Sequence, residues 1–207
     1  MVLTFFFFSF FTVAMAMVAK TARDAYFLSR FEKSILPLMF LAIAIIMAPI
    51  LTYYIKLSKK LPPRVLFLMT CAIFAVSFIL IQPFITGIAI PMVYIWVEVV
   101  VGIMLIQFWT FAADSFEPQQ AKRLFSIIAG GGSFAIMIIG MNLKPFVSAF
   151  GTDELLFLSA GFLVFASFFG LSSMQYFKNN PVKKGNLKPV QKNGKKKKLK
   201  TDPFLFG

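Results

Sequence analysis

The chain has 207 residues, of which 59% are hydrophobic and only 14% are charged. Soluble globular proteins carry about 45–50% apolar and about 25% charged residues, so this composition excludes an ordinary water-soluble domain. The chain has no histidine and a single cysteine, Cys71, and it therefore lacks imidazole bases, histidine metal ligands and internal disulfides. We expect neither an enzyme nor a cofactor or metal site.

Six long apolar segments predict six transmembrane helices. A helix needs about 20 apolar residues to cross a hydrocarbon core about 30 Å thick. The predicted spans are 2–28, 36–55, 65–82, 88–112, 126–146 and 155–177. None of them shows the strict alternation of a porin strand, so we predict an all-α membrane protein with a six-helix bundle over residues 1–177.

The first span begins with 18 uncharged residues, Val2–Ala19. This run is longer than the usual 7–15-residue core of a secretory signal peptide, and it has neither a basic region before it nor an A-x-A cleavage site. We therefore interpret it as a membrane-spanning helix rather than as a cleaved signal.

Three charged residues close the first span: Lys20, Arg23 and Asp24. If the helix continues through Phe27, Lys20 and Asp24 form an i,i+4 pair that partly neutralises itself, which leaves Arg23 as the freer charge. Arg is a bidentate ligand for phosphate or carboxylate, and Lys supplies a point charge. The cluster is a candidate anion site, and the open alternative is a positive helix end that contacts lipid headgroups.

Glu98 lies near the middle of the fourth span, where a charged side chain costs about 2.5–3.5 kcal/mol to insert. We expect its carboxylate to face a cavity or a partner; the alternative is a buried carboxyl that hydrogen-bonds a neighbouring helix. Helical spacing puts Val101, Gly102, Leu105 and Trp109 on the same face. Trp109 is a candidate to stack on a flat ligand, although anchoring at the membrane interface is the commoner role.

Glycines give the fifth span a side of little bulk. They are Gly130, Gly131, Gly132 and Gly140. A triple glycine can cradle a phosphate, but this one follows no strand and lacks the Lys-Ser/Thr ending of a P-loop. We therefore predict close helix packing or a hinge at these positions, with Gly102 leaving room on the fourth span.

The loop charges predict the orientation. With the N-terminus inside, sixteen basic residues lie on the cytoplasmic side and five on the other, which satisfies the positive-inside rule. Asp114, Lys122 and Arg123, between the fourth and fifth spans, are candidate gating or inner-loop charges. We expect the N-terminus and the tail to be cytoplasmic.

The tail is strongly basic, with ten lysines in Lys178–Lys200. It is low in complexity and broken by proline and glycine, so we expect it to be disordered. Nucleic-acid binding is one interpretation of such a run. Contact with anionic lipid headgroups, worth about 1 kcal/mol per basic residue, is the simpler one. Residues 201–207 turn apolar again, like the start of a second half.

Several motifs together resemble the nucleotide transporter (ATP/ADP translocase) family, a divergent branch of the major facilitator fold. They are KTARDAYFL after the first span, VEVVVGIMLIQFWTFAADSFEPQQAKRLFSI across the fourth span and its loop, and the glycine-rich fifth span. The family pattern falls on Lys20, Arg23 and Asp24, on Glu98, on Phe108 and Trp109, and on Ala121, Lys122, Arg123 and Phe125. Departures are Gln107, Asp114 and the loop between the second and third spans, which lacks the usual Asp and glycines.

The resemblance covers roughly residues 10–145. It implies a carrier with the first and fourth helices on the wall of a central cavity, exchanging nucleotides or another anionic solute by alternating access. Family members have twelve helices, so the chain corresponds to the six-helix N-terminal half of a major-facilitator-type transporter. A missing C-terminal half or a second copy would complete it, in the bacterial inner membrane.

Two other functions stay open. One is a proton-coupled carrier of a small organic solute, with Glu98 as the protonated site. The other is a non-transporting membrane scaffold whose lysine tail recruits acidic lipid or a partner. Dependence on a pH gradient without nucleotide exchange would favour the carrier, and loss of activity on deletion of residues 178–200 would favour the scaffold.

Overall fold

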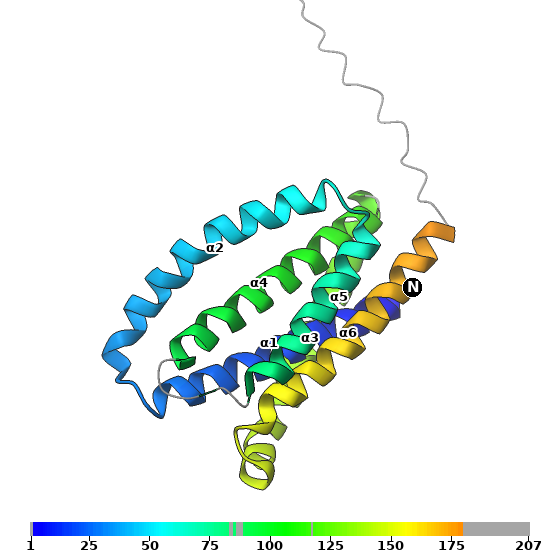
Figure 1. Ribbon diagram of the computed structural model, residues 1–207. Coiled ribbons are helices and arrows are strands. Elements are labelled where there is room, and N and C mark those ends of the chain that lie inside the picture. The colour runs from blue at the N-terminus through cyan, green and yellow to red at the C-terminus, as the bar shows by residue number, and fades with distance from the viewer. Residues whose placement is uncertain (1, 83–84, 86–88, 117, 180–207) are drawn as a thin grey trace, which may run out of the picture.

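The computed structural model describes residues 2–82, 85, 89–116 and 118–179, with side chains except those of 118–122 and 176–179. Its elements are α1 (Val2–Leu28), the short 3-10 helix η1 (Lys33–Ile35), α2 (Leu36–Ser58), α3 (Pro63–Ile81), α4 (Ala89–Ser115), α5 (Pro118–Phe150) and α6 (Glu154–Asn179). All six α-helices are long and apolar enough to cross a membrane (Figure 1). The predicted all-α, six-span class is thus confirmed. The expected disorder beyond residue 179 and the apolar element at 201–207 lie outside the described residues.

Proline and glycine mark several helix ends. Pro63 begins α3 and Pro118 begins α5, positions where the missing N–H is tolerated and the fixed φ suits a helix. α5 ends before Gly151, whose φ of +89° lies in the left-handed region that favours glycine. α5 is longer than the predicted span 126–146. The apolar run marks only the part of the helix within lipid, whereas the mostly polar Gln, Ala, Lys and Arg residues before it are also good helix formers.

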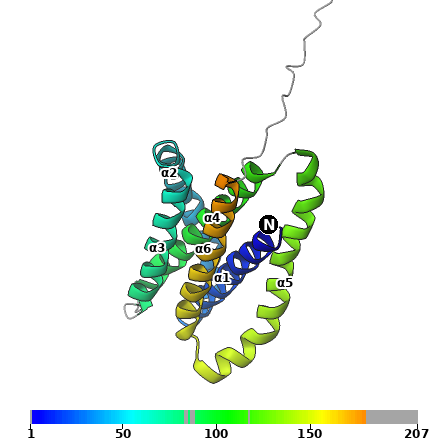
Figure 2. The same cartoon turned by 90° about the vertical axis from the view of Figure 1, so that its right-hand side faces the viewer.

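α1 is the central helix of the bundle. It packs against α4, α5 and α6, and Figure 2 shows it between α5 and α6. Its inner face includes Phe8, Met15 and Phe27, which are fully buried. The Phe8 ring makes edge contacts with Phe67 of α3 and Phe108 of α4. A polar side chain on this buried face of α1 would therefore contact a neighbouring helix rather than lipid.

α2 lies at the edge of the bundle. Met39 is its only buried residue, and α4 is its main long-helix neighbour. Large apolar side chains are exposed along it, including Leu38, Phe40, Leu41, Ile45, Tyr53 and Ile55. Extended apolar surface of this kind marks contact with a membrane or a partner. Together with six helices of spanning length, it identifies an integral membrane protein.

Two glycines bring α5 close to α1. A Cβ on Gly131 would overlap the backbone carbonyl oxygen of Phe6, and one on Gly132 would lie 3.0 Å from Val13 Cγ2. A Cβ on Gly130, which the sequence placed in the same packing set, would have no neighbour within 4 Å. Successive helical residues point about 100° apart, so three consecutive glycines cannot all face one helix.

The other two glycines of the predicted packing set face methionines. A Cβ on Gly140 of α5 would lie 3.5 Å from Met17 Cε of α1, an ordinary contact distance. A Cβ on Gly102 of α4 would overlap the Met47 Cε of α2. The Met47 side chain of α2 thus occupies the space beside Gly102. Gly102 therefore allows α2 and α4 to pack together, and it does not leave an open space beside Glu98.

Candidate functional site

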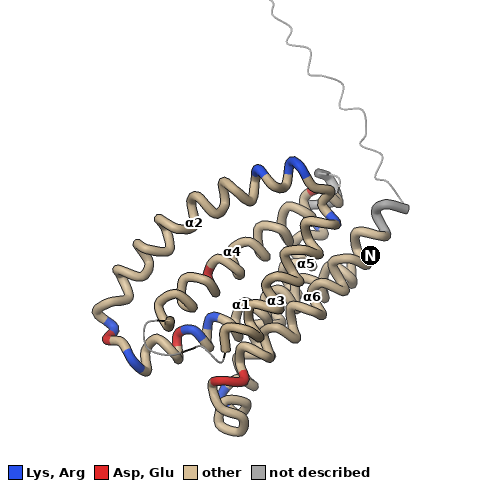
Figure 3. Tube along the Cα trace, in the orientation of Figure 1, with Lys and Arg blue, Asp and Glu red and all other residues tan. Residues whose placement is uncertain are grey.

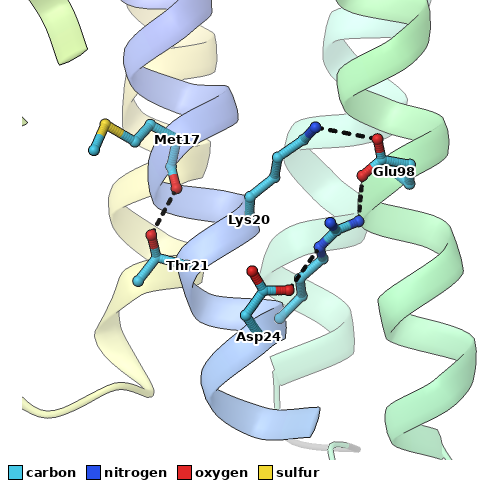
Figure 4. A network of polar contacts seen from close by, with 6 residues as sticks. Met17, Lys20, Thr21, Asp24 and Glu98 are labelled. Carbon is cyan, nitrogen blue, oxygen red and sulfur yellow. Dashed lines mark hydrogen bonds and ion pairs between the residues drawn. The ribbon is translucent and has the colours of Figure 1, made fainter. Parts of the chain in front are cut away.

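Glu98 is the centre of a charged cluster between α1 and α4. It is the tenth of the 27 residues of α4, far from both helix ends. Lys20 Nζ of α1 donates to Glu98 Oε1 at 3.1 Å, and Arg23 Nη1 donates to Glu98 Oε2. Figure 4 shows the Lys20 and Glu98 side chains pointing toward each other from the two helices. In Figure 3 α1 carries basic and acidic residues in a stretch that lies beside α4.

Arg23 is held in place by three partners. Its side chain is 7% exposed. Besides its bond to Glu98, its Nε donates to Asp24 Oδ1 at 3.2 Å, and its guanidinium carbon lies 4.3 Å from the centre of the Tyr94 ring. A desolvated cation over an aromatic face contributes about 2 kcal/mol. Sequence reasoning misses Tyr94, although its position four residues before Glu98, on the same helix face, is a signal that could have identified it.

The pairing within the cluster differs from the expected one. Lys20 bonds to Glu98 rather than to Asp24, and Arg23, expected as the freer charge, is the most enclosed member. An i,i+4 pair on a helix surface contributes only about 0.2–0.5 kcal/mol, whereas charge-assisted bonds across two packed helices form in a lower dielectric. Lys20, with one such bond and a 40% exposed side chain, is the freer cation.

The four ionic groups carry no net charge, and the cluster is open along one edge. The exposed edge is formed by Lys20 and Asp24, the latter with a 49% exposed side chain. A charged side chain costs most at the bilayer centre, and Lys20 and Asp24 lie eight and four residues before the end of α1. Water or further protein beside this edge would stabilise it more than acyl chains would.

Trp109 lies apart from the cluster. It follows Glu98 by eleven residues, which is about 16 Å along the axis of α4. Its side chain is exposed and its ring meets the edge of Phe125 on α5, with ring centres 6.1 Å apart. The structure therefore does not bring the indole together with the charged groups, and it places Trp109 at the contact between α4 and α5.

A second polar contact, which the sequence did not suggest, links α3 to α4. Gln107 Nε2 donates to Thr70 Oγ1 at 2.8 Å, and the two oxygens lie 3.0 Å apart. Both residues are buried. The sequence singled out Gln107 only as a departure from a family pattern, and nothing marked Thr70 within its apolar run.

Replacing Thr70 by Val should destabilise the helix bundle by about 1–3 kcal/mol. The substitution keeps the side-chain shape but leaves the buried Gln107 amide without its partner, which costs its desolvation energy. Unfolding of the purified protein in mixed micelles measures the effect. The matched control is Thr52→Val, because Thr52 is exposed on α2 and bonds only within its own helix; equal losses in the two variants would contradict the prediction.

The predicted inner-loop charges lie at one end of the bundle. Asp114 is near the end of α4, Arg123 is exposed near the start of α5, and the side chain of Lys122 is outside the described part. A pocket of about 210 Å³ lies beside Asp114, about 24 Å along α4 from Glu98. Its lining includes Tyr54, Ser58, Phe67, Gln107, Thr110 and Asp114. The pocket is thus distinct from the charged cluster.

The two ends of the bundle differ in charge. Among residues with described side chains, the end that joins α2 to α3 carries Lys56, Lys59, Lys60, Arg64 and Arg123 against one acid, Asp114. The other end carries Arg30, Lys33 and Lys144 against Glu32, Asp153 and Glu154. Lys20 and Arg23, counted with the outer loops in the sequence, lie within α1. Among the residues named at the two ends, one end therefore has a formal charge of +4 and the other a formal charge of zero.

Comparisons with protein-family models, with curated proteins and with solved structures return no match. The class of the protein, an integral membrane protein of six apolar helices, thus rests on its own sequence and structure. In the described part of the chain no group of three acidic, cysteine or histidine residues could hold a metal ion.

Proposed function

We propose that the protein is a membrane carrier that exchanges nucleotides of the ATP/ADP type, or another anionic solute, by alternating access. The observation that carries the proposal is the cluster of Lys20, Arg23 and Glu98, which joins the last third of α1 to the interior of α4 and stays partly accessible. Intramembrane charges of this kind are expensive and mark solute pathways. The motif resemblance to nucleotide transporters supports the same conclusion.

The ion pairs suggest how an anion would bind. Both cations bond to the Glu98 carboxylate, so a phosphate that binds both of them competes with this carboxylate. Lys20 has a single bond and can turn toward solute, while Arg23 stays fixed by Asp24 and Tyr94. When the solute leaves, the pairs with Glu98 form again. The cations thus have an anionic partner both with and without bound solute, which suits a carrier of anions.

The open edge of the cluster supports a carrier built from two six-helix units. Lys20 and Asp24 lie eight and four residues before the end of α1, and their exposed charges favour a polar neighbour. A C-terminal half of a longer chain, or a second copy of this one, would cover them and enclose a water-filled cavity. In this arrangement the two units rock around the central site.

The charge of the bundle ends supports an orientation. The end rich in Lys and Arg would face the cytoplasm under the positive-inside rule, in a bacterial inner membrane. The N-terminus and the lysine-rich tail would then be cytoplasmic, with the tail against anionic headgroups.

Replacing Lys20 by Gln should lower the uptake of labelled ATP into vesicles by about 10- to 100-fold, because a charge-assisted bond to the solute contributes about 1.5–3 kcal/mol. The protein should remain folded, since Lys20 is the most weakly held cation of the cluster. The control is Lys33→Gln, an exposed cation of η1. Unchanged uptake in the Lys20 variant, or uptake that needs a pH gradient and no internal nucleotide, would contradict the proposal.

A further inference from the structure

The pocket beside Asp114 has the chemistry of a second binding site. It opens between the ends of α2 and α4 and the start of α3, with Met174 of α6 at its side. Its volume of about 210 Å³ is below the roughly 300–1,000 Å³ of sites for drug-sized ligands. A nucleotide therefore does not fit, whereas a small head group does.

Hydrogen-bond acceptors line one side of this pocket. The Asp114 carboxylate is exposed and forms no ion pair with any described side chain. The hydroxyl oxygens of Tyr54, Ser58 and Thr110 add three further acceptors. The buried side chain of Phe67 forms part of the wall. A carboxylate and several hydroxyls together suit a primary ammonium group, which has three N–H donors.

Basic residues flank the same pocket. Lys59 directly follows the lining residue Ser58, and Arg64 directly follows the lining residue Pro63. Lys and Arg are the side chains that pair with phosphate, and these two adjoin the pocket lining in sequence. Nearby on α2 and α3, Ile55 and Val65 are exposed, which suits an acyl chain. The pocket and its flanks thus combine an acid, two bases and apolar side chains, which match the ammonium, phosphate and acyl chains of a phospholipid.

We propose that this pocket binds the head group of an aminophospholipid, with the primary ammonium on Asp114 and the phosphodiester toward Lys59 and Arg64. The position supports the assignment, since Asp114 is the penultimate residue of a membrane-spanning helix and so lies at head-group depth. A trimethylammonium head has no N–H donors and would leave the acceptors unpaired. The site therefore discriminates ethanolamine from choline lipids.

Native mass spectrometry of the purified full chain tests this assignment. The protein is exchanged into equal amounts of phosphatidylethanolamine and phosphatidylcholine with identical acyl chains, and the lipid retained after activation is counted. We expect about tenfold more retained ethanolamine lipid, because charge-assisted hydrogen bonds contribute about 1.5–3 kcal/mol. The preference should disappear in Asp114→Asn and weaken in Tyr54→Phe, which keeps the ring and removes the hydroxyl.

The matched control is Asp153→Asn, an exposed carboxylate at the opposite end of the bundle, which should keep the preference. Melting temperatures of the two Asn variants should agree, since both acids are exposed. Equal retention of the two lipids by the unmodified protein, or an unchanged preference in Asp114→Asn, would overturn the proposal. Equal lipid retention together with Asp114-dependent binding of free ethylammonium in a choline-lipid bilayer would overturn it in favour of a free amine.

Discussion

Replacing Glu98 by Gln is expected to lower the free energy of unfolding by about 3 kcal/mol and to abolish nucleotide uptake. Removal of one partner from an enclosed ion pair leaves an uncompensated charge, which costs about 3–5 kcal/mol. The lower figure applies because Glu98 is 25% exposed and Asp24 still compensates one cation. Unfolding in mixed micelles measures the stability, and labelled ATP uptake measures function.

A double-mutant cycle separates this electrostatic effect from general damage to α4. Arg23→Gln in the Glu98→Gln background removes the enclosed cation that has lost its bond to the Glu98 carboxylate, so the double variant should be less destabilised than the sum of the two single variants, by at least about 1 kcal/mol. Glu32→Gln is the matched control, because Glu32 is exposed and its carboxylate accepts only from the Ser34 hydroxyl. Additive effects at positions 23 and 98 would contradict the ion-pair description.

Replacing Gly131 by Ala should destabilise the bundle by about 1–3 kcal/mol, whereas Gly130→Ala should be neutral or slightly stabilising. The added methyl group at Gly131 would overlap the Phe6 carbonyl oxygen. This atom belongs to the backbone and cannot rotate away, so α1 and α5 must separate, as in other overpacked cores. At Gly130 the methyl group meets open space, and Ala is the better helix former.

Thermal unfolding in detergent measures both glycine variants. The pair is well matched, since the same atoms are added one residue apart on one helix. Equal losses of stability would show that the α1–α5 approach at Gly131 is not limiting, and a larger loss at position 130 would mean that this glycine, not Gly131, faces α1.

The spans were predictable from the sequence because bilayer thickness forces apolar runs of a fixed length. Charged residues on the first and fourth spans were also recognisable, because they interrupt these apolar runs. The partners of these charged residues could not be predicted. Helical spacing gives the face of a helix on which Lys20 or Glu98 lies, but it does not show which helix this face contacts. The sequence therefore favoured pairing of Lys20 with the nearby Asp24 over its actual partner Glu98, 78 residues away.

Three further features depend on tertiary packing alone. Thr70 and Gln107 are uncharged and sit in apolar segments, so no sequence pattern distinguishes their buried contact from a lipid-facing position. The glycines of α5 predicted a close approach, but which of three consecutive positions meets α1 depends on the rotation of α5 about its axis. The pocket beside Asp114 combines residues of four helices and has no local signature.

The salt bridge between Arg23 and Glu98 also constrains biosynthesis. The two residues are 75 positions apart, which at about 5–20 residues per second is roughly 4 to 15 seconds of translation. During that interval the first helix carries an excess positive charge with no acid opposite it, and the fourth emerges carrying the complementary negative one. We therefore expect α1 to pack stably in the bundle only after α4, which carries Glu98, has been synthesised.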